Sequence, residues 1–194
     1  ISRFYNVDSG RILIDGVDIS KVTLRSLRKQ MGVMMQDSFI FGGTIMDNIR
    51  YGNKTATDEE VIRAAKTVCA HDFIMQMEDG YQTQVNERGS RLSVGQRQLI
   101  SFARALLADP AILILDEATS SIDTETEIVL QEGLNHLLKG RTSFIIAHRL
   151  STIQNADCIM YISDGGIAEA GTHEELLQKH GKYYELYEAQ YKSV

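Results

Sequence analysis

Two adjacent carboxylates, Asp116 and Glu117, directly follow the apolar run at residues 111–115. A run of small and branched apolar residues is typical of a buried parallel strand, and ligands of open α/β sheets bind outside the carboxyl ends of such strands. There, one carboxylate can hold Mg²⁺ on a nucleotide while its neighbour orients or deprotonates an attacking water. The pair alone could equally be an ordinary strand-end cap, and motifs elsewhere in the chain are needed to distinguish a cap from a catalytic site.

Polar side chains also follow two other predicted strands. Gln36 comes after a buried strand predicted at residues 32–35, and His148 comes after a buried strand predicted at residues 143–147. Each residue alone could be a loop amide or a strand-end cap. Because the carboxyl ends of parallel strands lie at one edge of a sheet, we expect both side chains to lie near the acid pair.

The segment Leu92-Ser93-Val94-Gly95-Gln96 begins a predicted helix. Serine is a strong N-cap residue, and glycine lets a ligand approach the backbone closely. A helix N-terminus favours anions, because its first N–H groups are free and its dipole is positive there. A plain serine cap beside a permissive glycine is the structural alternative.

The predicted elements alternate in a way that is typical of an α/β protein. Residues 38–107 carry little strand signal and are expected to form a helical insertion in the α/β core. Capping boxes begin predicted helices at Thr57 and Thr172. We expect strands at 12–14, 32–35, 111–115, 143–147 and 158–162, and helices at 24–28, 44–50, 57–68, 71–78, 93–107, 124–138 and after 172.

Composition limits the classes of function. The 194 residues are 43% hydrophobic and carry a net charge of −6, which suits a globular domain and argues against a nucleic-acid partner. No apolar run approaches the roughly 18 residues of a membrane span. Cys69 and Cys158 lack metal or redox spacing, so we expect free buried thiols in a reducing compartment rather than a disulfide.

Taken together and in this order, the motifs resemble those of the nucleotide-binding domain of ATP-binding cassette (ABC) transporters. Residues 92–96 resemble the family signature, with Val94 where glycine is usual. Residues 112–117 resemble the Walker B strand with its catalytic glutamate, and residues 120–123 resemble the D-loop. Gln36 resembles the glutamine of the Q-loop, and His148 resembles the switch histidine.

The resemblance implies an ATPase with ATP and Mg²⁺ as its ligands. Asp116 would hold Mg²⁺, Glu117 would act as general base, and His148 would contact the γ-phosphate. Gln36 would sense Mg²⁺ and link the site to a membrane domain.

A second nucleotide-binding domain is the implied partner in a head-to-tail dimer. Residues Ser93, Val94, Gly95 and Gln96 would bind the nucleotide held by that partner, with Ser93 and Gly95 gripping its γ-phosphate, and Asp123 would communicate across the interface.

The resemblance also implies a fold and a place in the cell. The fold is a P-loop NTPase (RecA-like) core with a mainly parallel sheet and an inserted α-helical subdomain, incomplete at its N-terminus. Residues 1–37 would be the first part of the core, 38–107 the helical subdomain, and 108–194 the remainder. The domain would lie at the cytoplasmic face of the cell membrane, bound to a transmembrane domain.

Two segments resemble those of exporters that move drugs, lipids or peptides. One is Gln36-Asp37 with Ile40-Phe41 and residues 44–49, and the other is Glu87-Arg88-Gly89, which resembles the exporter X-loop. Without the family context, the second would be a solvated charged turn.

The phosphate-binding sequence Gly-x-x-x-x-Gly-Lys-Ser/Thr is not present, since Gly181-Lys182 is followed by tyrosine. The resemblance places this P-loop before Ile1, so we expect a cut N-terminus and a fragment that is inactive alone. Three alternatives stay open: a degenerate, regulatory half of a heterodimeric exporter, a soluble ABC ATPase that works on DNA or ribosomes, or a truncated gene product with only residual dimerising ability.

Overall fold

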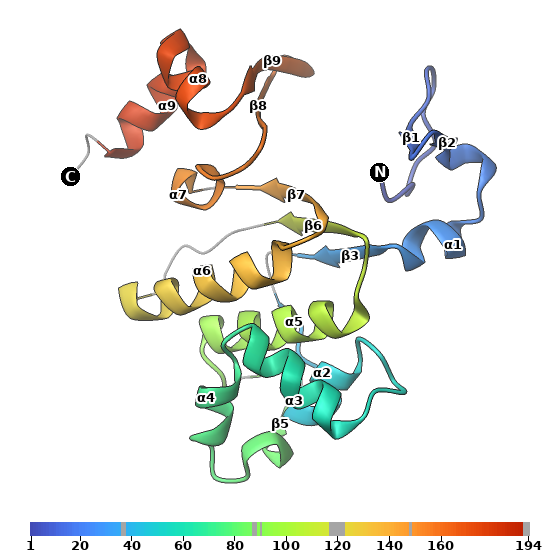
Figure 1. The fold of residues 1–194 in the computed structure, drawn as a ribbon, viewed down its shortest axis with the longest axis vertical. Helices are drawn as coiled ribbons and strands as arrows, with labels where there is room; N and C mark the ends of the chain where they lie inside the picture. The colour runs from blue at the N-terminus through green and yellow to red at the C-terminus, as the bar shows by residue number, and fades with distance from the viewer. Residues whose placement is uncertain (36–37, 87–88, 90, 117–122, 148, 192–194) are drawn as a thin grey trace. The chain divides into compact units, whose positions relative to one another are not determined.

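The computed structural model describes residues 1–194 except 36–37, 87–88, 90, 117–122, 148 and 192–194 (Figure 1). The chain divides into two compact units, residues 1–146 and 147–194.

A three-stranded parallel sheet organises the first unit. Its strands are β3 (Met31–Met34), β6 (Ile112–Asp116) and β7 (Thr142–Ile146), in the order β3-β6-β7. The register sets Val33 opposite Ile114, and Ile114 opposite Phe144. The predicted parallel sheet around the acidic strand is therefore confirmed.

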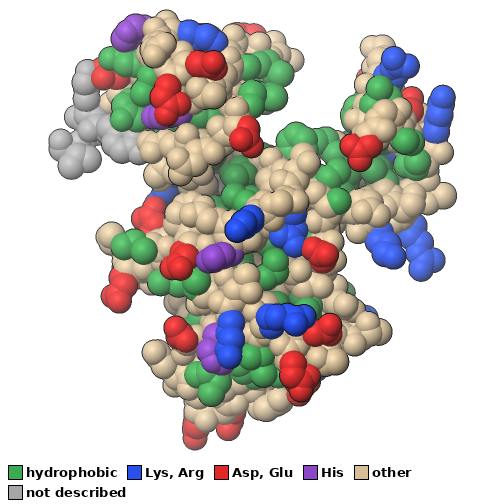
Figure 2. Space-filling view, in the orientation of Figure 1, with side chains coloured by type: hydrophobic (Ala, Val, Ile, Leu, Met, Phe, Trp, Pro, Cys, Tyr) green, Lys and Arg blue, Asp and Glu red, His purple; other side chains and the backbone are tan. Residues whose placement is uncertain are grey.

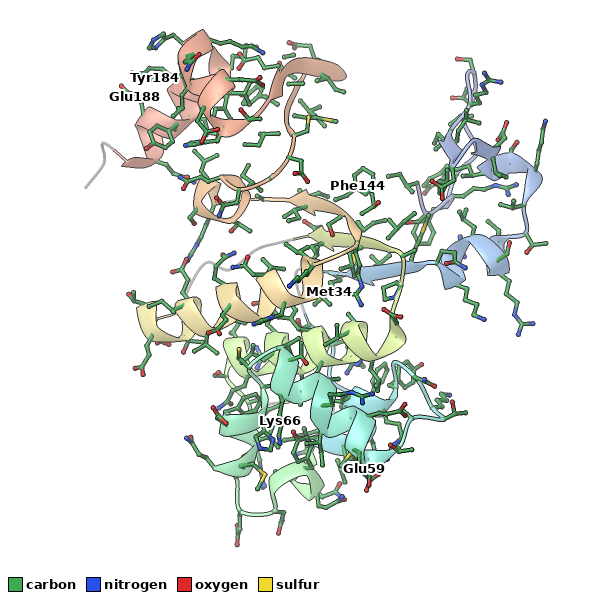
Figure 3. All side chains as sticks on the ribbon, viewed as in Figure 1. Met34, Glu59, Lys66, Phe144, Tyr184 and Glu188 are labelled. Carbon is green, nitrogen blue, oxygen red and sulfur yellow. The ribbon has the colours of Figure 1, made fainter. Side chains whose placement is uncertain are left out.

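The two faces of this sheet differ. On one face, Leu113 and Leu115 are buried in the main core, and Met34 packs against that core; Figure 3 shows Met34 and Phe144 on opposite sides of the sheet. On the other face, Phe144 is 42% exposed and Ile146 is 56% exposed. The strand predicted at 143–147 is present, but the expectation that it is buried is wrong, because the side chains of β7 alternate between exposed and half-buried.

The helical segment follows β3 and packs into one core with the helix after β6. Its apolar stripes recur at helical spacing and include side chains that are fully buried, among them Ile45, Val61 and Ile100. The helices are α2 (Ile45–Arg50), α3 (Asp58–Thr67), α4 (His71–Met75), α5 (Val94–Ala108) and α6 (Thr124–Leu138).

Two short strands interrupt this helical segment. Strand β4 (Gly43–Thr44) pairs antiparallel with β5 (Gln84–Val85), and a 3-10 turn, η2 (Gly80–Gln82), precedes β5. These strands were not predicted, because two-residue strands show no periodicity. Helix α4 also ends at Met75 rather than at the predicted residue 78.

A hairpin lies near the start of the chain. Strands β1 (Leu13–Ile14) and β2 (Val17–Asp18) are joined by Asp15 and Gly16, which both have positive φ, as a two-residue hairpin turn requires. The helical turn η1 (Ile19–Lys21) and helix α1 (Leu24–Lys29) lead into β3.

The second unit contains a hairpin and three helices among its described residues. Its small core consists of Leu150, Ile159, Leu176 and Tyr183. The predicted capping box at Thr172 is confirmed. The elements are α7 (Leu150–Ile153), β8 (Ile159–Ser163), β9 (Gly166–Gly171), α8 (His173–Lys179) and α9 (Lys182–Tyr191).

The two cysteines differ in exposure from what the sequence predicted. Cys69 and Cys158 are free thiols, but Cys69 is only half-buried and Cys158 is exposed, so the expectation of two buried thiols is wrong.

Over α2–α6, basic and acidic side chains are interspersed on the face in view (Figure 2). Within the described part of the chain, none of the helices has both the length and the apolarity to cross a bilayer.

Candidate functional site

The edge of the sheet at which its strands end is the first part of the candidate site. The strands β3, β6 and β7 are parallel neighbours, so they end at the same edge with Met34, Asp116 and Ile146. The structure thus brings together the strand ends that the sequence singled out. The predicted site residues Gln36, Glu117 and His148 lie outside the described residues and stay predictions.

Asp116 is the site residue of this edge that the structure describes. It is half-buried at the last position of β6 and lies opposite Ile146 of β7 in the ladder. Because side chains alternate along a strand, it shares a face with Ile114, away from the core that buries Leu113 and Leu115. A carboxylate oxygen at this place suits Mg²⁺, which prefers oxygen ligands.

The start of α5 is the second part of the candidate site, and a complete capping box builds it. Ser93 Oγ accepts a hydrogen bond from the Gln96 backbone N–H at 3.1 Å, and Gln96 Oε1 accepts one from the Ser93 N–H at 3.0 Å. Val94, the next residue, is 48% exposed. The predicted N-cap at Ser93 is therefore confirmed.

The first turn of α5 carries no acidic residue, whereas the first turns of α2, α3, α6 and α8 each carry at least one. Acids in a first turn compensate the positive end of the helix dipole. The first turn of α5 therefore does not itself compensate the positive end of its helix dipole, and such an end suits an anion.

Gly95 has a packing role at this helix start. It is buried, and a Cβ at its position would collide with the Thr126 side-chain methyl of α6. A second glycine, Gly133, makes a similar approach, since a Cβ there would lie 2.6 Å from the Val68 carbonyl oxygen. The absent side chain of Gly95 lets α5 and α6 come into contact, and the suggestion that Gly95 also opens the backbone to a ligand stays a prediction.

Asp123 lies beside this helix contact. Its exposed carboxylate caps α6 by accepting a hydrogen bond from the Thr126 N–H at 2.9 Å. The backbone and side-chain hydrogen bonding with Thr126 holds the pKa of Asp123 below its usual value. Because Thr126 also meets Gly95, the region of the predicted D-loop and the region of the predicted signature are joined through one residue.

The sequence analysis gave no role to a buried polar pair behind the loop at residues 38–44. Asn48 is 1% exposed; its Oδ1 accepts from the Phe41 N–H at 2.9 Å and from Arg104 at 3.0 Å. Arg104 also donates to the Phe39 carbonyl oxygen at 2.9 Å, and burial lowers its pKa. The sequence signal for this pair was Arg104 itself, an arginine that lies between the apolar positions of α5.

This pair anchors an aromatic cluster, defined as Phe39, Phe41 and Tyr51. The Phe41 ring stacks on Tyr51 at 4.4 Å, Phe39 meets Phe41 edge-on at 5.0 Å, and the Arg104 guanidinium lies 5.1 Å from the Phe41 centroid. Phe39 is 51% exposed and Tyr51 is 52% exposed. Exposed aromatic rings held in a fixed position are typical of contact surfaces.

Comparisons with known proteins agree with these features. The profile of the family described as "ABC transporter" matches residues 1–120. The chain is 58% identical over 194 residues to the Bacillus subtilis (strain 168) protein "Uncharacterized ABC transporter ATP-binding protein YknV", covering 100% of this chain and 32% of that protein. It is 53% identical over 192 residues to an ATP-dependent lipid A-core flippase of Syntrophus aciditrophicus (strain SB), covering 99% of this chain and 32% of the flippase.

A solved structure extends the similarity to the fold. The structure of a bacterial Atm1-family ABC exporter with ATP bound superimposes with a TM-score of 0.89 at 45% identity, over 98% of this chain and 33% of that one. The chain therefore belongs to the ABC transporter family and has the ABC ATPase fold. It spans about a third of the length of the relatives it matches.

Proposed function

We propose that the chain is the ATP-binding and ATP-hydrolysing part of an ABC exporter, which drives the export of a drug, lipid or peptide. The carrying observation is that β3, β6 and β7 end side by side, so that the residues after them start from one edge of the sheet. The match to an ATP-dependent lipid flippase and to an exporter with ATP bound supports the same activity.

The proposed chemistry is phosphoryl transfer from ATP to water. Asp116 would hold Mg²⁺, which would neutralise charge on the phosphates, and Glu117 would accept the proton of the attacking water. His148 steadies the γ-phosphate, and Gln36 connects the metal site to the membrane portion. The three-part division at residues 1–37, 38–107 and 108–194 belongs to this proposal.

A second copy or a related domain completes the site in a head-to-tail dimer. Ser93, Val94, Gly95 and Gln96 face the nucleotide of the partner, and the Ser93 hydroxyl donates to its γ-phosphate while still accepting from the Gln96 N–H. The first turn of α5, which carries no acid, supports an anion at this place. Asp123 would relay closure of the dimer, since it caps the helix on which Gly95 packs.

The transmembrane portion of the exporter is the other proposed partner, which places the chain at the cytoplasmic face of the membrane. The exposed aromatic cluster supports this partner because it offers rings that are already fixed by Asn48 and Arg104. A helix with apolar side chains would cover such a surface at little entropic cost.

The substitution Glu117→Gln tests the catalytic assignment in a protein that also contains the P-loop. We expect ATP hydrolysis to fall about 10²–10⁴-fold while ATP binding is retained and a closed dimer accumulates. Glu78→Gln, at an exposed acid of the helical segment, is the control and should leave hydrolysis unchanged. Unchanged steady-state hydrolysis in Glu117→Gln would show that Glu117 is not the general base, and it would favour the degenerate, regulatory alternative.

The 194-residue chain gives a second test. It carries no Gly-x-x-x-x-Gly-Lys-Ser/Thr sequence, and this loop supplies most contacts to the β- and γ-phosphates in such sites. We therefore expect weak ATP binding by calorimetry and negligible turnover. A turnover near that of an intact domain would contradict this expectation.

A further inference from the structure

The start of helix α7 is capped by a side chain from another helix of the second unit. The first N–H groups of a helix have no partner within the helix itself. The N-cap position of α7 is Arg149, whose side chain carries only donors and makes no capping hydrogen bond. The Leu150 backbone N–H donates instead to Gln190 Oε1 at 3.2 Å, from a residue of α9 that lies 40 positions further along the chain.

The side chain of Leu150 is anchored as well. It is 5% exposed and forms the small core of this unit together with Ile159, Leu176 and Tyr183. Burial therefore holds the Leu150 side chain while Gln190 holds its backbone N–H. The first residue of α7 is a fixed point of the chain.

Helix α9, which carries the acceptor, is itself fixed at its first turn. The Glu169 carboxylate of β9 accepts hydrogen bonds from the Lys182 N–H at 2.6 Å and from the Tyr183 N–H at 3.2 Å. The hydroxyl of the buried Tyr183 also forms a hydrogen bond with His173 Nδ1 at 2.8 Å. Two neighbouring elements, β9 and α8, thus hold the beginning of α9.

The packing of α9 also directs Gln190 towards α7. Tyr183, Tyr187 and Gln190 are spaced i, i+4 and i+7, so they lie along one side of the helix. Both tyrosines belong to or pack against the core that contains Leu150. The end of α9 therefore lies beside the start of α7 within this unit (Figure 1).

We propose that Gln190 is a positioning residue for ATP hydrolysis: by fixing the start of α7, it supports the backbone that carries His148, two residues earlier in the sequence. The inference rests on the proposed role of His148, which lies outside the described residues. A hydrogen bond that only stabilises the second unit is the alternative. The two differ in kinetics, because a group that serves the transition state alone lowers kcat and leaves KM nearly unchanged.

Gln190→Leu tests the inference in a protein that also contains the P-loop. The change removes the acceptor at an exposed position and so creates no cavity in the core. We expect kcat for ATP hydrolysis to fall about three- to tenfold, as for the loss of one hydrogen bond, and KM for ATP to change less than about twofold. Gln178→Leu, the same change at an exposed glutamine of α8, is the matched control and should leave both constants unchanged.

Two conservative variants separate loss of the acceptor from loss of folding. Gln190→Glu keeps a side-chain oxygen at the same distance from the backbone and should keep kcat within about twofold of the parent value. Gln190→Asn withdraws the oxygen by one methylene and should lower kcat as Gln190→Leu does. Urea denaturation shows that each variant is folded in the assay. Unchanged kcat in the Leu and Asn variants, or an equal fall in all three variants, would overturn the inference.

His148→Ala separates the inference from the function on which it rests. Alone, it should lower kcat at least about tenfold, because a contact with the γ-phosphate is lost. Gln190→Leu added to His148→Ala should lower kcat no further, since Gln190 acts through His148. A full further fall would overturn the inference and leave the proposed function intact. Unchanged kcat in His148→Ala would overturn both.

Discussion

Helices α3 and α5 begin with the same local motif but differ in what surrounds it. Thr57 and Glu60 form the capping box of α3 at 2.8 and 3.3 Å, and Ser93 and Gln96 form that of α5 at 3.0 and 3.1 Å. The first turn of α3 holds three acids, whereas that of α5 holds none. Equivalent hydrogen bonds therefore start two helices whose first turns differ in charge.

The two helix starts also differ in their tertiary contacts. The second helical residue of α3, Glu59, is exposed, whereas the corresponding Gly95 of α5 is buried against Thr126. The start of α3 is thus determined by its own sequence, and that of α5 by its own sequence together with α6. The predictions that follow separate these two contributions.

Gly95→Ala should have the largest effect on stability, because the added methyl must displace the Thr126 side chain. We expect a loss of about 1–3 kcal/mol in the free energy of unfolding, measured by urea denaturation. Thr126→Ser in the same chain removes the opposing methyl and should restore part of the loss. Glu59→Ala, the matched change in α3, should stay within about 0.5 kcal/mol. Equal losses at the two positions would contradict the tertiary role of Gly95.

Ser93→Ala and Thr57→Ala should have similar, smaller effects on stability. Each removes one side-chain acceptor from a helix N-terminus, which costs about 1 kcal/mol. In a protein that contains the P-loop, only Ser93→Ala should also reduce ATP hydrolysis, by at least about tenfold. A comparable loss of hydrolysis in Thr57→Ala would remove the functional distinction between the two helices.

The pH dependence of the capping boxes should show the smallest effect. Hydrogen bonds with Thr44 hold the pKa of Asp47, the acidic partner in the α2 box, below its ordinary value of 3.8. Since the folded pKa is the lower one, this stabilisation is fully present above about pH 4 and is lost as the pH falls through the folded pKa.

The destabilisation by Thr44→Ala should therefore shrink below about pH 4, by about 0.5 kcal/mol or less because Asp47 is exposed. The α5 box has the neutral Gln96 as its partner, so the effect of Ser93→Ala should be nearly the same at pH 7 and pH 3. Urea titrations at both pH values measure the difference. A matching decline in the two variants would show that the charge of Asp47 is not responsible.

Features that depend on neighbouring residues were predictable from the sequence. The helix predicted at 124–138 is present as Thr124–Leu138, and the capping boxes at Thr57 and Thr172 form as expected. A helix start depends on side chains three residues apart, so the sequence alone contains the whole interaction. The parallel strand before the acid pair was predictable for a similar reason, because its apolar run and the residues that end it are adjacent in the sequence.

Features that depend on distant partners were not predictable in the same way. Neither the contact of Gly95 with Thr126 nor the pairing of Asn48 with Arg104 leaves a periodic signal in the sequence. The exposure of Phe144 and of Cys158 depends on which surfaces pack against them, so the predicted burial of both was wrong. The roles of the candidate site residues remain predictions, to which the family assignment adds support.

The strand order β3-β6-β7 has a consequence for how the chain folds. Residues 117–141 connect β6 to β7, whereas residues 35–111, including α2 to α5, separate β3 from β6. Closing the longer loop costs more chain entropy, and contacts between distant segments form slowly. We expect the β6–α6–β7 unit, a parallel pair joined by its crossover helix, to form early, and β3 to add to it only after the intervening helices have shortened the distance between the strands.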